Sequence, residues 1–173
     1  MKTLAGFLIR HASERDATSI AEIQIRTLQA FCQRLTPDDK PQALDFGSRT
    51  VEWKETLGTP VGTVLVAIKG IRMAGFCTLA PSNDPDAIPE TAVIGCFCVD
   101  PPAWGRGAGR GLVEEVVAQA RKRGYSRLTR WVVVADDRAK RFCEKAGFIP
   151  DGNEKTEEIC GHAMRAVRFS MAL

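Results

Sequence analysis

The spacing of apolar residues changes several times along the chain and predicts a mixture of strands and amphipathic helices. Apolar runs and alternating runs predict strands, whereas apolar residues three and four apart predict helices that pack one face on a sheet. In chain order the pattern predicts strand Phe7–Ala12, a helix from Ala17 that ends before Pro37, helix Ser48–Leu57, strands Thr63–Ile68, Arg72–Leu79 and Thr91–Val99, a helix marked by Leu112–Ala120, strand Leu128–Ala135, a short helix marked by Ala139–Ala146, and a hairpin of Glu154–Ile159 with Ala163–Met171. In a chain of 173 residues, this order predicts one α/β domain, residues 1–173.

The two N-terminal helices differ in how clearly the sequence marks them. Ser13-Glu14-Arg15-Asp16 has the spacing of a capping box and predicts a helix start. In the second helix, Val51 and Leu57 are expected to face inward, while the position of Trp53 is left open. The stretch Thr36–Gly47 between the helices is weakly patterned.

Composition and charge narrow the functional classes. Hydrophobic residues make up 45% of the chain and charged residues 26%, and no run approaches the roughly 18 apolar residues that a membrane span requires. The cysteine usage described below favours a cytoplasmic location. The formal net charge is only +3, so we expect no nucleic-acid partner, and the lack of a long apolar run predicts no membrane partner. Between Trp104 and Gly147, however, eleven basic residues stand against five acidic ones. That local excess predicts either a solvated helix face or a segment that binds a phosphate-bearing ligand.

The six cysteines predict neither a disulfide framework nor a metal centre. They lie mostly within apolar or amphipathic stretches of a chain large enough to fold without cross-links, so reduced thiols are expected. Cys96 and Cys98 lack a second ligand pair, and the only histidines, His11 and His162, stand near opposite ends of the sequence. We therefore expect no metal, and interpret the two cysteines as strand residues.

A glycine-rich turn after the predicted strand Thr91–Val99 is the clearest candidate for ligand binding. Its sequence is Trp104-Gly105-Arg106-Gly107-Ala108-Gly109, and a helix follows. Such glycines let backbone N–H groups approach a ligand at the positive end of a helix dipole, which favours phosphate or pyrophosphate. The turn is not a P-loop, because no Gly-Lys-Ser/Thr follows, and it lacks the acid of a dinucleotide fingerprint. The alternative is that the glycines serve only the tight turn.

Two segments, Val99–Leu112 and Ala139–Phe148, resemble the GNAT-type N-acetyltransferase superfamily. The first resembles the family's acyl-coenzyme A pyrophosphate loop, with Trp104 where Arg or Gln is usual. The specific part of the resemblance covers about Thr91–Phe148, and the rest of the chain matches in the order of its elements. The resemblance implies a GNAT-like fold with a central mixed, mostly antiparallel sheet flanked by helices. It also implies acetyl-CoA as the cosubstrate and no metal.

The resemblance further implies which residues hold acetyl-CoA. Backbone groups on the central strand would bond the pantetheine arm, and the glycine-rich turn would hold the pyrophosphate. Asp136 stands where relatives often have an Asn that bonds the pantetheine amides, although a helix N-cap is an equally good interpretation. The residues expected to contact the cosubstrate are Phe97, Cys98, Val99, Trp104, Gly105, Arg106, Gly107, Ala108, Gly109, Arg110, Asp136 and Phe142.

Two positions depart from the family's catalytic pattern. Val93 stands where many relatives have a Glu that deprotonates the amine through water, which leaves Glu90 and Asp100 as the nearest substitutes. A surface role is the alternative for Glu90. Cys143 stands where a Tyr commonly protonates the departing thiolate, and a thiol is acidic enough to donate that proton. Packing on the apolar stripe of its helix is the alternative for Cys143. Glu90 and Cys143 are the expected catalytic residues.

These features together predict an N-acetyltransferase. It would transfer the acetyl group of acetyl-CoA to a primary amine of an unidentified small molecule or peptide, by direct attack in a ternary complex. The alternative is an acyl-CoA-binding module with little or no transferase activity, because the usual Glu and Tyr are absent. The acceptor pocket is expected from the first two helices, the Pro81–Pro89 loop and the terminal hairpin. Homodimer formation is left open.

Overall fold

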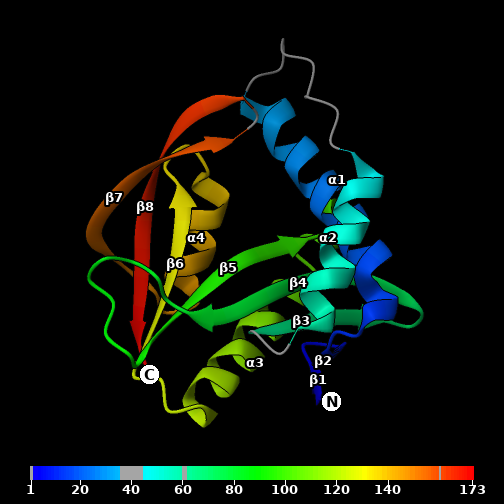
Figure 1. Cartoon of the computed structure of the whole chain (residues 1–173), viewed down its shortest axis with the longest axis horizontal. Coiled ribbons are helices and arrows are strands. Elements are labelled where there is room, and N and C mark those ends of the chain that lie inside the picture. Colours follow the sequence, from blue (N-terminus) through cyan, green and yellow to red (C-terminus); the bar gives the residue numbers. More distant parts are fainter. Residues whose placement is uncertain (1, 36–44, 60–61, 160) are drawn as a thin grey trace. The chain divides into compact units, whose positions relative to one another are not determined.

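The computed structural model describes residues 2–35, 45–59, 62–159 and 161–173. Apart from β1, which the sequence pattern did not predict, the helices and strands follow one another in the predicted order (Figure 1). They are β1 (Lys2–Leu4), β2 (Phe7–His11), α1 (Ala17–Leu35), α2 (Phe46–Gly58), β3 (Thr63–Lys69), β4 (Arg72–Pro81), β5 (Thr91–Val99), α3 (Ala108–Lys122), β6 (Arg127–Val133), α4 (Asp137–Lys145), β7 (Ile149–Ile159) and β8 (His162–Ala172). Most of the weakly patterned stretch between the first two helices, residues 36–44, lies outside the described residues.

The chain divides into two compact units, and β4, β5 and α3 each contribute residues to both. Residues 1–78 and 96–116 form the first unit, and residues 79–95 and 117–173 form the second. Neither unit is one continuous segment, because the chain passes between them within β4, within β5 and within α3. The single domain expected from the sequence stays a prediction.

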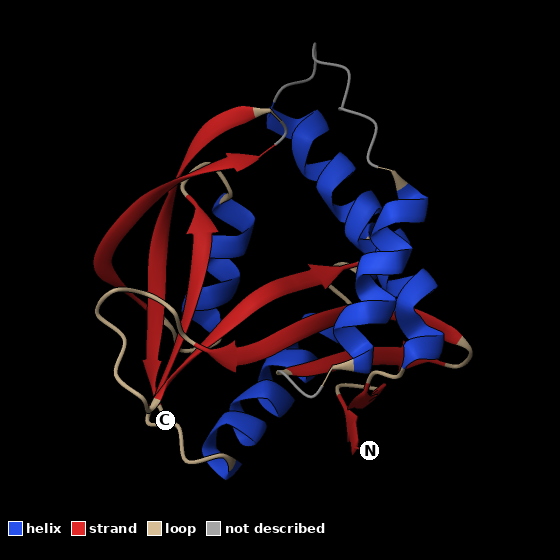
Figure 2. Ribbon diagram, in the orientation of Figure 1, coloured by secondary structure: helices blue, strands red, loops and turns tan. Residues whose placement is uncertain are grey.

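In the first unit, helices cover both faces of a sheet in which the strand order is β1-β2-β3-β4-β5 (Figure 2). The α1 and α2 helices pack on one face around a cluster that includes Ile20, Trp53, Val66 and Phe76. The start of α3 lies against the other face, where Gly111 approaches Ile9. This second contact places the N-terminus of α3 beside the sheet.

The N-terminal helices confirm one prediction and correct another. The Ser13 N–H donates to Asp16 Oδ2 at 2.7 Å, and both bonds of the capping box form. Val51, expected inward, is 54% exposed, whereas Trp53 is 7% exposed and meets the Phe76 ring edge-on with centroids 5.1 Å apart. Two residues turn an α-helix by about 200°, so the helix that buries Trp53 must expose Val51. The larger aromatic side chain decides the orientation of α2.

In the second unit, the start of β5 pairs in parallel with β6, from Thr91 opposite Arg127 to Ile94 opposite Arg130. The β6–β8 and β8–β7 pairs are antiparallel. The mixed, mostly antiparallel sheet is therefore confirmed. The terminal hairpin is longer than predicted, since β7 begins at Ile149 and an irregularity separates Pro150 from Glu154.

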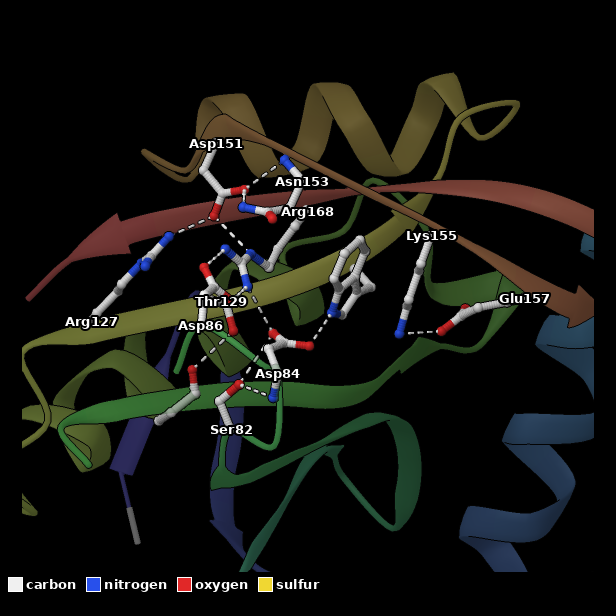
Figure 3. A network of polar contacts seen from close by, with 12 residues as sticks. Ser82, Asp84, Asp86, Arg127, Thr129, Asp151, Asn153, Lys155, Glu157 and Arg168 are labelled. Carbon is white, nitrogen blue, oxygen red and sulfur yellow. Dashed lines mark hydrogen bonds and ion pairs between the residues drawn. The ribbon is translucent and has the colours of Figure 1, made fainter. Parts of the chain in front are cut away.

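A buried arginine joins the loop after β4 to the terminal hairpin of the second unit. Arg168, on β8, is 2% exposed and donates to Asp86 through Nη1 and Nη2, to Asp84 through Nη1 and to Asp151 through Nε (Figure 3). The Trp131 Nε1 also donates to Asp84, at 3.0 Å. The sequence indicated only turn residues in this loop. Its carboxylates instead neutralise one buried guanidinium, which would otherwise be very costly to desolvate.

Candidate active site

The end of β5 is held by side chains as well as by strand pairing. The Asp100 N–H donates to the Ala74 carbonyl at 2.9 Å, and the Trp104 indole donates from Nε1 to the Val99 carbonyl at 2.6 Å. Thr27, on α1, also donates to that carbonyl, at 3.4 Å. Trp104 thus ties the glycine-rich turn back to β5, a role that its position in the motif did not indicate.

Two glycines give this turn its shape. Gly105 and Gly107 have φ values of 70° and 98°, in the left-handed region that side chains disfavour. A Cβ on Gly107 would lie 3.1 Å from the Ala5 Cβ and 3.2 Å from the Ala5 carbonyl oxygen, whereas one on Gly105 would meet nothing within 4 Å. Gly107 is therefore required by conformation and by space. The space beside Gly105 is unoccupied by other residues.

The start of α3 has the properties of an anion site. The helix begins at Ala108, and its first turn contains no acidic residue. An α-helix leaves its first N–H groups without intrahelical partners, and they carry a partial positive charge. Arg106 is exposed beside them, while Arg110 forms an ion pair with Glu114 at 2.7 Å. These residues fit a pyrophosphate, held mainly by backbone groups.

The two candidate bases occupy different environments. Asp100 accepts two hydrogen bonds from Arg26, at 2.9 Å and 3.0 Å, so both of its oxygens are engaged. Glu90 is exposed in the turn before β5, and its carbonyl oxygen accepts hydrogen bonds from the Ser126 and Arg127 N–H groups. The Glu90 side chain is thus the more accessible carboxylate of the two.

Three predicted residues of the second unit, Asp136, Phe142 and Cys143, lie on α4 or at its N-cap. Asp136 is its N-cap and accepts from the Ala139 N–H at 3.2 Å, so the capping interpretation is confirmed. Cys143 is 1% exposed, and Arg130 on β6 donates from Nη1 to its Sγ at 3.6 Å. Burial raises the pKa of the Cys143 thiol, and Arg130 opposes that rise. Phe142 is half-buried.

The remaining cysteines correct one expectation. Cys77, Cys96, Cys98 and Cys143 are reduced thiols, but Cys32 is disulfide-bonded, so the prediction of reduced thiols is wrong for this residue. Burial raises the pKa of the Cys96 thiol, with a smaller opposite effect from Arg49. Within the described ranges, no group of three or more His, Cys, Asp or Glu side chains is arranged to hold a metal ion. No described helix is long and apolar enough to span a bilayer.

The comparison with known families is decisive. The model of the acetyltransferase (GNAT) family matches residues 19–148. The chain belongs to this family. An N-acetyltransferase of Mycobacterium tuberculosis, itself described as uncharacterized, is 27% identical over 138 residues, which cover 79% of this chain and 85% of the relative. The predicted enzyme class, an acetyl-CoA-dependent acyltransferase, is thereby confirmed.

Solved structures agree with the GNAT fold. The ribosomal-protein-alanine N-acetyltransferase of Brucella melitensis has a TM-score of 0.76 and 21% identity, with 96% of this chain and 99% of that chain covered. A protein of Salmonella typhimurium, solved with its cofactor acetyl-CoA, has a TM-score of 0.71 and 19% identity, with 96% and 94% covered. At these identities the likeness shows the fold alone.

Proposed function

We propose that this GNAT acetyltransferase transfers the acetyl group of acetyl-CoA to a primary amine of a small molecule or peptide, by direct attack in a ternary complex. The observation that carries the proposal is the turn before α3. Two left-handed glycines and a helix start without acidic residues present backbone N–H groups to an anion. The Salmonella relative was solved with acetyl-CoA, which has a pyrophosphate of the kind that such a turn binds.

In the first unit, the residues proposed to hold acetyl-CoA run from Phe97 to Val99 and from Trp104 to Arg110. Bound acetyl-CoA supplies a thioester, an activated acyl group. The glycine-rich turn would bind the pyrophosphate through backbone N–H groups, with Arg106 adding charge from the surface. Asp136 and Phe142, in the second unit, remain predicted contacts, and the Asp136 carboxylate also caps α4.

The proposed catalytic groups are the side chains of Glu90 and Cys143 and a backbone N–H of β5. Glu90 is the proposed base, because the other candidate, Asp100, is bound by Arg26 through both carboxylate oxygens. A base is needed only to accept the proton that the attacking amine releases. A backbone N–H of β5 would stabilise the oxyanion, and Cys143 would return a proton to the leaving thiolate.

The class of acceptor is proposed from the names of similar solved structures, and the location from the sequence. Three of the similar solved structures are named as acetyltransferases of ribosomal-protein alanine, which makes peptide amines a class to test first. We keep the proposal of a cytoplasmic enzyme without a nucleic-acid or membrane partner. Dimer formation would be tested by light scattering at several concentrations.

Calorimetric titration with acetyl-CoA tests the proposed binding turn. Gly105→Glu places a carboxylate in the turn, and Gly124→Glu is the matched control near the C-terminal end of α3. Both glycines have positive φ, 70° and 81°, and neither has an atom within 4 Å of an added Cβ. We expect micromolar binding by the wild type and by Gly124→Glu, and loss of binding by Gly105→Glu. Equal affinity in all three proteins would contradict the proposed site.

A transfer assay tests the reaction itself. Release of free coenzyme A thiol would be followed with a panel of small amines and N-terminal peptides, together with Glu90→Gln and Cys143→Ser. We expect both substitutions to lower kcat by at least about a hundredfold, the lower end of the range for a general acid or base. Unchanged kcat in either variant would remove that residue from the mechanism but leave the transferase.

A further inference from the structure

The thiol proposed as the proton donor has a cationic neighbour without an assigned role. Arg130 donates from Nη1 to the Cys143 Sγ at 3.6 Å, across thirteen residues of sequence and from β6 to α4. Cys143 is 1% exposed and Arg130 is half-buried, and both belong to the second unit. We propose that Arg130 is a positioning residue that makes Cys143 competent to donate a proton, an inference that rests on the proposed acetyl transfer.

The balance of the proton transfer shows why a cation is needed. The S–H bond of Cys143 breaks, an S–H bond forms on the leaving thiolate, and the negative charge moves to the Cys143 Sγ. A thiolate at a position with almost no solvent contact is strongly disfavoured unless an opposite charge faces it. The Arg130 guanidinium already lies within hydrogen-bonding distance, and a charge-assisted bond strengthens as the thiolate forms. The proton released by the attacking amine restores the thiol, so no further reactant is required.

The other influences on this thiol act in the opposite direction. Burial has the largest effect and raises the pKa of Cys143, and the nearby carboxylates of Asp136 and Glu144 raise it further. Arg130 lowers it, through its charge and through its hydrogen bond. Removal of the guanidinium therefore leaves only influences that disfavour the thiolate. Without Arg130, Cys143 would be a weaker acid and a poorer donor.

Titration of the Cys143 thiol tests the pair without any transfer reaction. Ultraviolet thiolate absorbance would be measured against pH, with the same protein carrying Cys143→Ser subtracted each time. We expect Arg130→Gln to raise the thiol pKa by about one unit or more. Arg130→Lys keeps a positive charge, so its Cys143 pKa should stay close to that of the wild type. Lys145→Gln removes an exposed charge from α4 and should leave the Cys143 pKa unchanged. An unchanged pKa in folded Arg130→Gln overturns the proposal; if that variant does not fold, an unchanged pKa in Arg130→Met, which also removes the charge but keeps the aliphatic stem, does so.

The pH profile of acetyl transfer tests the catalytic part. In Arg130→Gln, kcat near neutral pH should fall on the order of tenfold. The alkaline limb of the profile should move to higher pH, as the titration does, with KM for acetyl-CoA unchanged. If the Cys143 titration shifts in Arg130→Gln but the pH profile of kcat does not, the proposed role of Arg130 in acetyl transfer is wrong. Absence of transfer by the wild type with every amine would instead defeat the proposed function, while the titration would still decide whether Arg130 sets the ionisation of Cys143.

Discussion

Arg168 and Asp86 form a two-pronged ion pair, with the Nη1–Oδ1 and Nη2–Oδ2 distances both 2.6 Å, although 82 residues separate them in the sequence. The pair connects β8 to the loop before β5. Asp84 and Asp151 complete the environment of the guanidinium, at 3.1 Å and 2.8 Å. All three nitrogens of the guanidinium thus donate to a carboxylate, which explains how a strand of the second unit tolerates a 2% exposed arginine.

Arg168→Met should therefore destabilise the protein strongly. The substitution leaves three carboxylates facing one another without their shared cation, and loss of one partner of a buried ion pair costs about 3–5 kcal/mol. Urea unfolding followed by circular dichroism measures the loss. Arg165→Met is the matched control on the same strand, because Arg165 is exposed and its nearest contact to Glu154 is 3.7 Å. We expect less than about 0.5 kcal/mol from that control, and a similar small loss from Arg168→Met would mean that the cluster contributes little.

The acidic side of the stability profile should depend on Asp16. Hydrogen bonding to Arg10, and then the Ser13 N–H and hydroxyl, hold the pKa of Asp16 at about 2, below its usual value. A lowered pKa stabilises the fold above the unfolded-state pKa near 3.9, and this stabilisation disappears as pH falls through about 2. In Asp16→Asn, the decrease in unfolding free energy between about pH 5 and pH 2 should be smaller, by roughly 2 kcal/mol. Parallel profiles for the two proteins would contradict the assignment.

Asp86, in the second unit, should also make the stability of the protein fall at low pH, as Asp16 does. The hydrogen bond from Arg168 holds the pKa of Asp86 at about 2. The contribution of this carboxylate is therefore present at neutral pH and lost as pH falls through about 2. Asp86→Asn should flatten the acidic part of the profile. In an Arg168→Met background, the same substitution should have almost no effect on the profile, since its partner is already gone; an undiminished effect there would show that another group sets the Asp86 pKa.

The sequence predicted the elements well because each one carries its own local signal. Capping residues, glycines and apolar periods located α1, α3 and β5 to within a few residues. The face of α2 was predicted less well, because Val51 and Trp53 are both apolar and only tertiary packing against Phe76 selects the tryptophan. Local pattern cannot decide between two apolar faces of one helix.

The candidate site was predictable only where its chemistry depends on local sequence. The glycine-rich turn and the cap at Asp136 follow from short motifs. The Arg130–Cys143 contact, the Asp100–Arg26 pair and the aspartates around Arg168 join residues from 13 to 84 positions apart. No periodicity or motif encodes such pairings. The sequence indicates only that a charged residue needs a partner if the fold buries it, and not which residue that partner is.

The two glycines of the turn should respond differently to alanine. Gly105→Ala introduces only the strain of a left-handed residue, about 1 kcal/mol. Gly107→Ala adds a Cβ within 3.1 Å of Ala5, with a backbone oxygen at 3.2 Å that has little room to move. Because over-packing typically costs a further 1–3 kcal/mol or so, Gly107→Ala should be the more destabilised by about that amount. Urea unfolding of the two variants makes the comparison, and equal midpoints would show that β1 and its turn yield easily. In that case the shape of the turn before α3 would depend on the glycine conformations alone, and not on the contact with Ala5.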